Sequence, residues 1–214
     1  NASKKVLEFD NELSILEISH RSNAFTDVMS ESISLVRDIL DVPSNYSIIF
    51  LQGGASLQFC MVALNLLKKN NGSAAYLNTG TWSKKAIFEA KKFGDIEIVG
   101  DSSHKNFNYI PKDFKISDSH DYFHCTSNNT IYGSQIKNFP ECNIPVVCDM
   151  SSDIFSRKID VNKFGLIYAG AQKNLGLAGA TLVIVKDEIL GKSKRDIPSM
   201  LDYRTHIDKK SMFN

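Results

Sequence analysis

The sequence predicts an α/β domain whose sheet is covered on both faces. Short, continuously apolar runs alternate with helix-like segments along the chain, which is typical of strands buried on both sides. Polar or glycine-rich residues follow several of these runs directly, and ligands of such sheets bind at the carboxyl ends of the strands. No fixed repeat and no low-complexity linker interrupts residues 20–200, so one large domain is expected.

The first elements follow one another from residue 25. Apolar residues at three-to-four spacing predict an amphipathic helix over 25–40, and the turn-forming residues 41–45 end it. A β-rich run over 46–51 predicts a strand that stops at Gln52-Gly53-Gly54. The residues after it, 55–69, are predicted as a second helix.

The later elements continue the same alternation. Residues 74–77 are predicted as a strand, and residues 82–93 as a helix with four lysines in water and Gly94 as its cap glycine. The further strands are predicted at Ile96–Val99, Tyr122–Cys125, Val146–Cys148, Leu166–Ala169 and Ala180–Val185. The lysine- and aspartate-rich residues 186–214 are expected to leave the domain.

The composition is that of an ordinary globular protein. The chain has 214 residues, of which 43% are hydrophobic and 23% charged, with a formal net charge of +1; disorder and coiled coil are therefore poor interpretations. Without a run of basic residues, we expect no strong binding of nucleic acid or anionic lipid. No apolar stretch reaches the roughly 18 residues of a membrane span, and no signal peptide is expected at the first residues.

Cysteines and histidines give no metal-binding pattern. The four cysteines form no C-x-x-C pair: they are Cys60, Cys125, Cys142 and Cys148. A reducing, cytoplasmic compartment without disulfides is predicted. His120 and His124 are four residues apart, but along a strand that spacing is about 13 Å, too far for the two to share one zinc ion.

Lys173 and Asp149 are the residues that suggest chemistry. Lys173 follows the apolar run 166–170, so the part of its side chain nearest the backbone is expected to be buried in the protein. A partly desolvated amine has a lowered pKa and attacks carbonyls. A surface lysine in a turn is the ordinary alternative. Asp149 ends another apolar run, where it could cap a helix or hold the ring nitrogen of pyridoxal phosphate in its protonated form.

Two further features suit pyridoxal phosphate. Small residues at 53–56 lead into a helix, as a phosphate-binding turn does, and Trp82 offers a flat surface for the ring. With Lys173 and Asp149, these features supply an amine, a nitrogen partner, a phosphate site and an aromatic face. Spacing alone does not decide between such a site and a generic α/β protein.

Eight longer strings match one known family in order along nearly the whole chain. They are Ser19–Ser22, Phe50–Phe59, Asn78–Ser83, Ser127–Gly133, Asp149–Ser152, Ser156–Val161, Tyr168–Gly176 and Pro198–Tyr203. Through them the sequence resembles the phosphoserine aminotransferases, which are class-V, fold-type-I enzymes that use pyridoxal phosphate. The resemblance implies a mostly parallel seven-stranded sheet covered by helices. The family's amino-terminal segment and its carboxyl-terminal small domain have no match here, and Leu177 stands where many members have proline.

The resemblance also implies a division of the chain. Residues 1–24 would lead into the large domain, and residues 25–196 would form that domain and bind pyridoxal phosphate. Residues 197–214 would contact a partner subunit and lead to a small domain that is missing.

The resemblance assigns a role to each matching residue. Lys173 is similar to the lysine that forms a Schiff base with the cofactor, Asp149 to the partner of the pyridine nitrogen, and Trp82 to the aromatic residue on the ring face. The other implied contacts are Thr130 with the cofactor, Ala55, Ser56 and Gln172 with its phosphate, Asn214 with the cofactor phosphate of the partner subunit, and His20 and Arg21 with the substrate.

The implied function is transfer of the amino group of L-glutamate to 3-phosphohydroxypyruvate, giving O-phospho-L-serine and 2-oxoglutarate. The implied setting is serine biosynthesis, with pyridoxine biosynthesis as a second pathway, in a cytoplasmic homodimer with active sites at the subunit boundary. Two alternatives stay open. One is a non-catalytic fragment that binds cofactor or only dimerises. The other is a different fold-type-I enzyme, such as a desulfurase or lyase.

Overall fold

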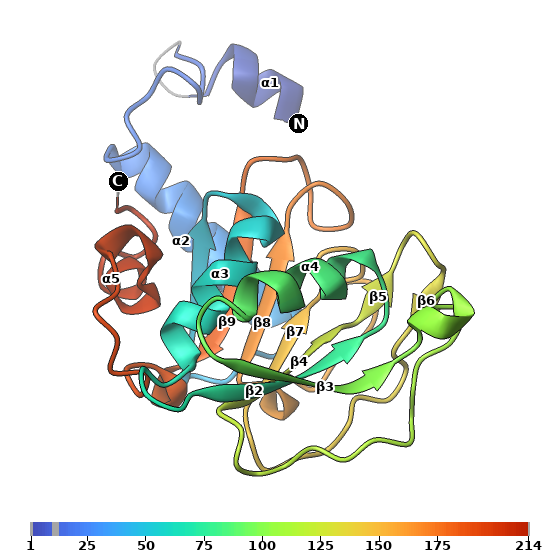
Figure 1. The fold of residues 1–214 in the computed structure, drawn as a ribbon. Coiled ribbons are helices and arrows are strands. Elements are labelled where there is room, and N and C mark those ends of the chain that lie inside the picture. Colours follow the sequence, from blue (N-terminus) through green and yellow to red (C-terminus); the bar gives the residue numbers. More distant parts are fainter. Residues whose placement is uncertain (1, 10–12, 214) are drawn as a thin grey trace.

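A seven-stranded sheet forms the centre of the molecule in a computed structural model that describes residues 2–9 and 13–213 (Figure 1). The strand order is β1-β9-β8-β7-β4-β2-β3. The strands are β1 (Tyr46–Leu51), β2 (Ser73–Asn78), β3 (Asp95–Asp101), β4 (Tyr122–Thr126), β7 (Val146–Asp149), β8 (Leu166–Gly170) and β9 (Thr181–Lys186). Strand β9 runs antiparallel to β1 and β8, which flank it, and all other neighbouring pairs of this sheet are parallel. The predicted mostly parallel sheet is confirmed.

Short helices and one small hairpin surround the sheet. The helices are α1 (Ala2–Leu7), α2 (Asn23–Ile39), α3 (Gly54–Leu66), α4 (Thr81–Ala90) and α5 (Tyr203–Asp208), with 3-10 turns at Ser103–Lys105, Val161–Lys163, Asp187–Ile189 and Ser199–Leu201. The hairpin pairs β5 (Asn128–Asn129) with β6 (Ser134–Gln135). No helix among the described residues is both long and apolar enough to cross a bilayer.

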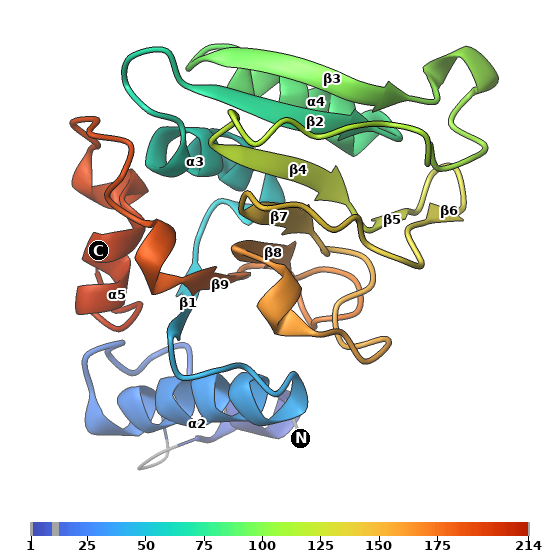
Figure 2. The ribbon, with the colours of Figure 1, turned by 90° about the horizontal axis from the view of Figure 1, so that it is seen from below.

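Alternating side chains of the strands build a separate core on each face of the sheet. In β8, Leu166 and Tyr168 join one core while Ile167 and Ala169 join the other, as the two-residue period of a strand requires. Helices α3 and α4 cover the first face. The second face is covered by α2 and by loop segments between residues 110 and 164, and Figure 2 shows α2 lying beside β1, away from α3 and α4.

The predicted helix over 82–93 is shorter than expected. It ends at Ala90 with Lys91 as its C-cap, and Gly94 does not have the left-handed conformation of a cap glycine. A Cβ at Gly94 would lie 2.6 Å from the carbonyl oxygen of Gly72. The glycine is therefore required by a close approach of two chain segments, which local periodicity does not reveal.

The prediction that residues 186–214 leave the domain is wrong. Tyr203 is fully buried in the core under α3, and its hydroxyl donates a 2.6 Å hydrogen bond to Gln58 Oε1. Asn65, two turns further along α3, donates to the carbonyl oxygen of Leu201 at 2.8 Å. Apolar residues spaced among the charged ones thus hold this segment against α3.

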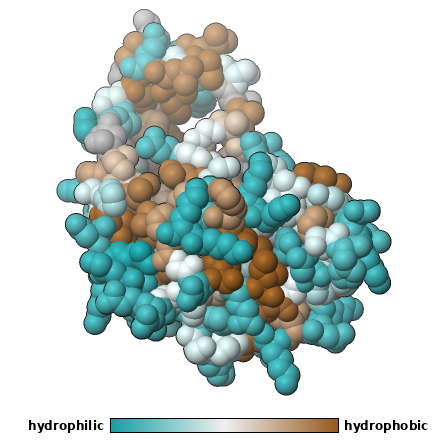
Figure 3. Space-filling view, in the orientation of Figure 1, coloured by the Kyte–Doolittle hydropathy of each residue, from teal (hydrophilic) through white to brown (hydrophobic). Residues whose placement is uncertain are grey.

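Exposed apolar side chains gather around α1, at the top of Figure 3. They include Val6, Leu7, Leu13 and Leu16. Among the described residues, neither core contains a side chain that precedes Ile33. The division into residues 1–24, 25–196 and 197–214 remains a prediction.

Candidate active site

A cavity of about 260 Å³ lies where β4, β7 and β8 end and where α3 and α4 begin. This is the edge of the sheet, at the carboxyl ends of the strands, where the sequence predicts the binding site. The lining comprises Gly53, Gly54, Ala55, Ser56, Trp82, Thr126, Asn128, Asp149, Ser151, Ser152, Gly170, Ala171, Gln172, Lys173, Ala178, Gly179 and Ala180.

Asp149, the last residue of β7, lies buried in the cavity wall. Its Oδ1 accepts hydrogen bonds from the backbone N–H of Ser151 at 2.9 Å and from the Ser151 hydroxyl at 2.6 Å. The same hydroxyl accepts from the Gly170 N–H at 3.0 Å, so Ser151 fixes the carboxylate against β8. Residues 150–157 form turns rather than a helix, which excludes the helix-cap alternative for Asp149.

Burial sets the protonation behaviour of Asp149. Removal of the carboxylate from water raises the pKa of Asp149 above its ordinary value, while the Ser151 hydrogen bonds and the positive charge of Lys173 oppose that rise. The Asp149 carboxylate could therefore accept a hydrogen bond from a cationic donor in the cavity, because it is shielded from water and already oriented by the Ser151 hydroxyl.

Lys173 lines the cavity from a loop three residues beyond β8. Its ammonium group donates a 2.9 Å hydrogen bond to Thr130 Oγ1 and lies 5.9 Å from the centre of the Trp82 ring. Lys173 is exposed, so the expectation that the backbone end of its side chain is buried is wrong. Strand β8 ends at Gly170, and the loop carries the lysine out of the sheet edge.

The first turn of α3 forms the opposite wall of the cavity. Gly53 and Gly54 have φ angles of 88° and 65°, a conformation that glycine adopts without strain, and they turn the chain from β1 into the helix. Ala55 and Ser56 follow in the first turn, where backbone N–H groups have no partner within the helix. Such a helix N-terminus is a ready binding site for phosphate.

Trp82 contributes an aromatic face from the start of α4. Its indole Nε1 is buried without a hydrogen-bond partner among the described residues. Thr126 Oγ1, in the same lining, is buried and unpartnered too. A buried acid, a primary amine, an aromatic ring and a helix N-terminus around one cavity fit pyridoxal phosphate.

The other expected site residues divide into three groups. Gln172 lies in the lining. Thr130 does not line the cavity itself but accepts a hydrogen bond from Lys173, which does. His20 and Arg21 lie in the segment before α2 and do not line the cavity. Asn214 lies outside the described residues.

Four polar lining residues received no role from the sequence. They are Thr126, Asn128, Ser151 and Ser152. Each stands at or just after the end of β4 or β7. This position at a strand end is the feature of the sequence from which their place in the site could have been predicted. The mutual contacts of Asn128 and Ser152, and the contact of Ser151 with Gly170, could not be predicted, because they join segments some twenty residues apart.

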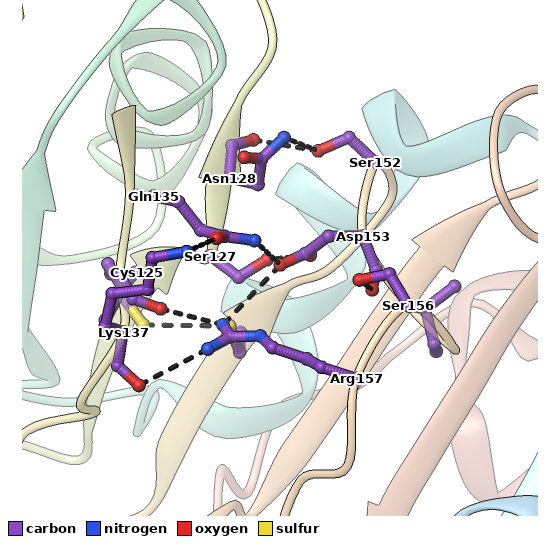
Figure 4. Close-up of polar contacts among 12 residues, drawn as sticks. Cys125, Ser127, Asn128, Gln135, Lys137, Ser152, Asp153, Ser156 and Arg157 are labelled. Atoms are coloured by element: carbon purple, nitrogen blue, oxygen red, sulfur yellow. Dashed lines mark hydrogen bonds and ion pairs between the residues drawn. The ribbon is translucent and has the colours of Figure 1, made fainter. Parts of the chain in front are cut away.

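Asp153 ties the hairpin that follows β4 to the loop that follows β7, as Figure 4 shows. Its buried carboxylate accepts hydrogen bonds from the Ser127 hydroxyl and, at 3.1 Å, from Gln135 Nε2. Arg157 lies 3.5 Å from the same carboxylate and donates to the carbonyl oxygen of Ile136 at 2.7 Å. This cluster flanks Thr130 on both sides in sequence, so it holds the hairpin that presents Thr130 to Lys173.

Asn128 and Ser152 form a second link between the same two segments. Asn128 Nδ2 donates to Ser152 Oγ, and Ser152 Oγ donates to the Asn128 carbonyl oxygen, both at 2.9 Å. Because both residues also line the cavity, their mutual hydrogen bonds fix part of its wall.

His120 and His124 serve separate structural roles. His120 pairs with Glu97 at 2.8 Å. His124 is fully buried, and burial lowers the pKa of His124 to about 3, so this side chain is neutral at physiological pH. Among the described residues, no group of three or more His, Cys, Asp or Glu side chains could hold a metal ion.

Comparisons with known proteins agree with this geometry. The aminotransferase class-V family model matches residues 4–213. A phosphoserine aminotransferase of Flavobacterium johnsoniae is 61% identical over 215 residues, covering 100% of this chain and 60% of the relative. One of Bacteroides fragilis is 55% identical over 213 residues, covering 99% and 59%.

Solved structures give the same result. The phosphoserine aminotransferase from Bacillus circulans subsp. alkalophilus matches with a TM-score of 0.94 at 41% identity, over 100% of this chain and 60% of that one. A PLP-bound phosphoserine aminotransferase from Trichomonas vaginalis matches with a TM-score of 0.92 at 35% identity, over 100% and 64%. The chain thus spans about 60% of the length of the curated relatives it matches.

Proposed function

The chain belongs to the aminotransferase class-V family, and from this premise we propose that it is the large domain of a phosphoserine aminotransferase that uses pyridoxal phosphate. The reaction would transfer the amino group of L-glutamate to 3-phosphohydroxypyruvate, giving O-phospho-L-serine and 2-oxoglutarate. The observation that carries the proposal is the meeting of Lys173, Asp149, Trp82 and the first turn of α3 around one cavity.

The lining residues divide the work of holding the cofactor. Asp149 would keep a proton on the pyridine nitrogen, because a carboxylate stabilises a cation in a buried site. Trp82 would lie against the ring, and the N–H groups of Ala55 and Ser56, with Gln172, would bind the phosphate. When bound, pyridoxal phosphate supplies an electron sink for negative charge that develops at the α-carbon of the amino acid.

Lys173 would have two tasks. Its amine would bind the cofactor covalently between turnovers, and when released it would move the α-proton of the bound amino acid. Thr130 accepts a hydrogen bond from this amine, which holds the long, exposed side chain at the cavity. Substrate carboxylate or phosphate groups would be bound by Arg21, since a guanidinium pairs well with both anions, together with its neighbour His20, although neither residue lines the cavity of this chain.

The proposal includes a cytoplasmic homodimer with active sites at the subunit boundary. Gln172 and Lys173 are exposed although they line the cavity, so a neighbouring chain has room to close that side. Residues 197–214, with Asn214, would form part of the contact. Light scattering tests this assembly, and a strictly monomeric full-length protein that is fully active would contradict it.

The desulfurase alternative has no support in the cavity. Such an enzyme needs a reactive cysteine near its cofactor. Cys125 and Cys148 are buried on neighbouring strands, Cys60 and Cys142 are partly buried, and none of the four lines the cavity. Burial also raises the pKa of the Cys60 and Cys142 thiols, which disfavours the nucleophilic thiolate.

A substrate comparison tests the proposed activity. The full-length protein, loaded with pyridoxal phosphate, is assayed with glutamate and either 3-phosphohydroxypyruvate or hydroxypyruvate, and 2-oxoglutarate is measured. We expect strong preference for the phosphorylated acceptor. Equal use of both acceptors would indicate another aminotransferase of the family, and no transamination at all would favour the non-catalytic alternative.

A further inference from the structure

Thr126 lines the cavity and carries a buried hydroxyl that has no hydrogen-bond partner among the described residues. It is the last residue of β4 and is 3% exposed, and its Oγ1 makes no hydrogen bond among the described residues. Buried hydroxyls nearly always have a partner, because leaving one without costs its lost hydration. Valine has the same shape and would avoid that cost.

The position of Thr126 relative to Asp149 indicates what the missing partner is. The two residues lie opposite each other in the parallel pairing of β4 and β7, and both line the cavity. Ser151 takes up Asp149 Oδ1, which leaves the second carboxylate oxygen without a protein donor among the described residues. Two neighbouring residues of the lining thus each carry an oxygen atom for which no hydrogen bond is found among the described residues.

We propose that the Thr126 hydroxyl is a further cofactor-binding group, which contacts the polar edge of the pyridine ring beside Asp149. The inference rests on the proposed function, because it takes pyridoxal phosphate as the occupant of the cavity. A hydroxyl both donates and accepts, so it can complete the hydrogen bonding of a ring whose nitrogen is held by the neighbouring carboxylate. Thr126 then binds the cofactor. The unpaired hydroxyl lowers the stability of the ligand-free protein, and the hydrogen bond to the bound ring offsets this loss.

The chain offers a matched control for this inference. Thr181, the first residue of β9, also has a fully buried Oγ1 without a partner, but it does not line the cavity. Replacing either threonine by valine removes an unpartnered hydroxyl of the same kind. Only the change at Thr126 removes one from a residue of the cavity lining.

The chain also contains an intrinsic fluorescent probe of ligand binding. Trp82 is the only tryptophan in the sequence, and it lines the cavity. Titration of the 214-residue chain with pyridoxal phosphate, followed by Trp82 emission, therefore reports binding at this site without an activity assay. Urea unfolding without the cofactor gives the stability of each variant separately.

We expect Thr126→Val to weaken pyridoxal phosphate binding about tenfold, the loss of one hydrogen bond. Its urea midpoint without cofactor should be unchanged or higher. Thr126→Ser should bind within about threefold of the unsubstituted chain, since it keeps the hydroxyl, and Thr181→Val should bind as the unsubstituted chain does.

Two results overturn the inference. One is unchanged affinity in Thr126→Val. The other is a lowered urea midpoint in Thr126→Val with no rescue by serine, which would show that the hydroxyl has a structural role. If the unsubstituted chain shows no change in Trp82 emission with pyridoxal phosphate, the proposed function itself fails, and this inference fails with it.

Discussion

Lys173 Nζ donates a 2.9 Å hydrogen bond to Thr130 Oγ1, which joins the loop after β8 to the hairpin after β4. The bond is exposed, so its loss should change the free energy of unfolding by less than about 0.5 kcal/mol. Its effect should appear instead in the position of the amine. Thr130→Val is predicted to lower kcat of the full-length enzyme about tenfold, because the lysine then samples more rotamers.

Thr130→Ser is the control for that substitution. Serine keeps the hydroxyl that accepts from Lys173, so kcat should recover most of the loss. If Thr130→Val and Thr130→Ser both turn over at the original rate, the Lys173–Thr130 bond has no part in catalysis.

Asp153→Asn should destabilise the fold. The substitution removes a buried charge that Ser127, Gln135 and Arg157 surround, and a buried acceptor network of this kind should account for about 1–3 kcal/mol of the free energy of unfolding. Urea denaturation measures the change. Lys163→Ala, which breaks the exposed Lys163–Glu141 pair, should cost less than about 0.5 kcal/mol. Equal losses in the two variants would contradict the account of the Asp153 cluster.

Tyr203→Phe tests the packing of residues 186–214 on α3. Without the Tyr203 hydroxyl, the buried Gln58 Oε1 loses its 2.6 Å donor, at a cost of about 1–3 kcal/mol. Chemical denaturation of the 214-residue chain gives this value. Tyr109→Phe removes a hydroxyl from an exposed ring and should leave the urea midpoint in place. If Tyr203→Phe behaves in the same way, the segment does not close over α3 in solution.

Asp149→Asn should separate stability from function. The folded-state pKa of Asp149 is raised by burial, so the unfolded chain releases this proton at lower pH than the folded one, and the folded protein loses stability as pH rises through the folded pKa. At neutral pH the ligand-free asparagine variant should therefore be the more stable one, with the difference vanishing in acid. In the full-length enzyme the same variant should lose most of its turnover, because the ring nitrogen no longer keeps its proton.

Stability measured against pH checks the first half of this prediction, and kcat checks the second. An asparagine variant that is less stable than the original at every pH would show that the Asp149 carboxylate is not desolvated. Unchanged kcat would count against Asp149 as the partner of the pyridine nitrogen.

The sheet and part of the site could be predicted because their signals are local. The run 166–170 ends in glycine, and Asp149 ends another run. The seven predicted strands agree with the seven strands of the central sheet within about two residues at each end, whereas the β5–β6 hairpin was not predicted. A parallel sheet brings such strand ends to one edge, so Asp149, Trp82 and Ala55 could be expected together before their contacts were known.

The remaining features depend on contacts between distant segments. Tyr203 and Gln58 are separated by 145 positions, and no composition pattern in residues 186–214 reports their hydrogen bond. The exposure of Lys173 follows from the course of the loop after Gly170. Thr126 resembles an ordinary strand residue, since threonine favours strands, and only the packed structure shows that its hydroxyl has no partner.

The most direct test of the account is to locate the lysine that binds pyridoxal phosphate. The 214-residue chain is incubated with pyridoxal phosphate, reduced with borohydride to make the linkage permanent, and digested for peptide mapping by mass spectrometry. We predict a yellow protein whose label lies on Lys173, and a Lys173→Ala variant that takes up neither colour nor label. A label on another lysine, or equal labelling of the alanine variant, would contradict it.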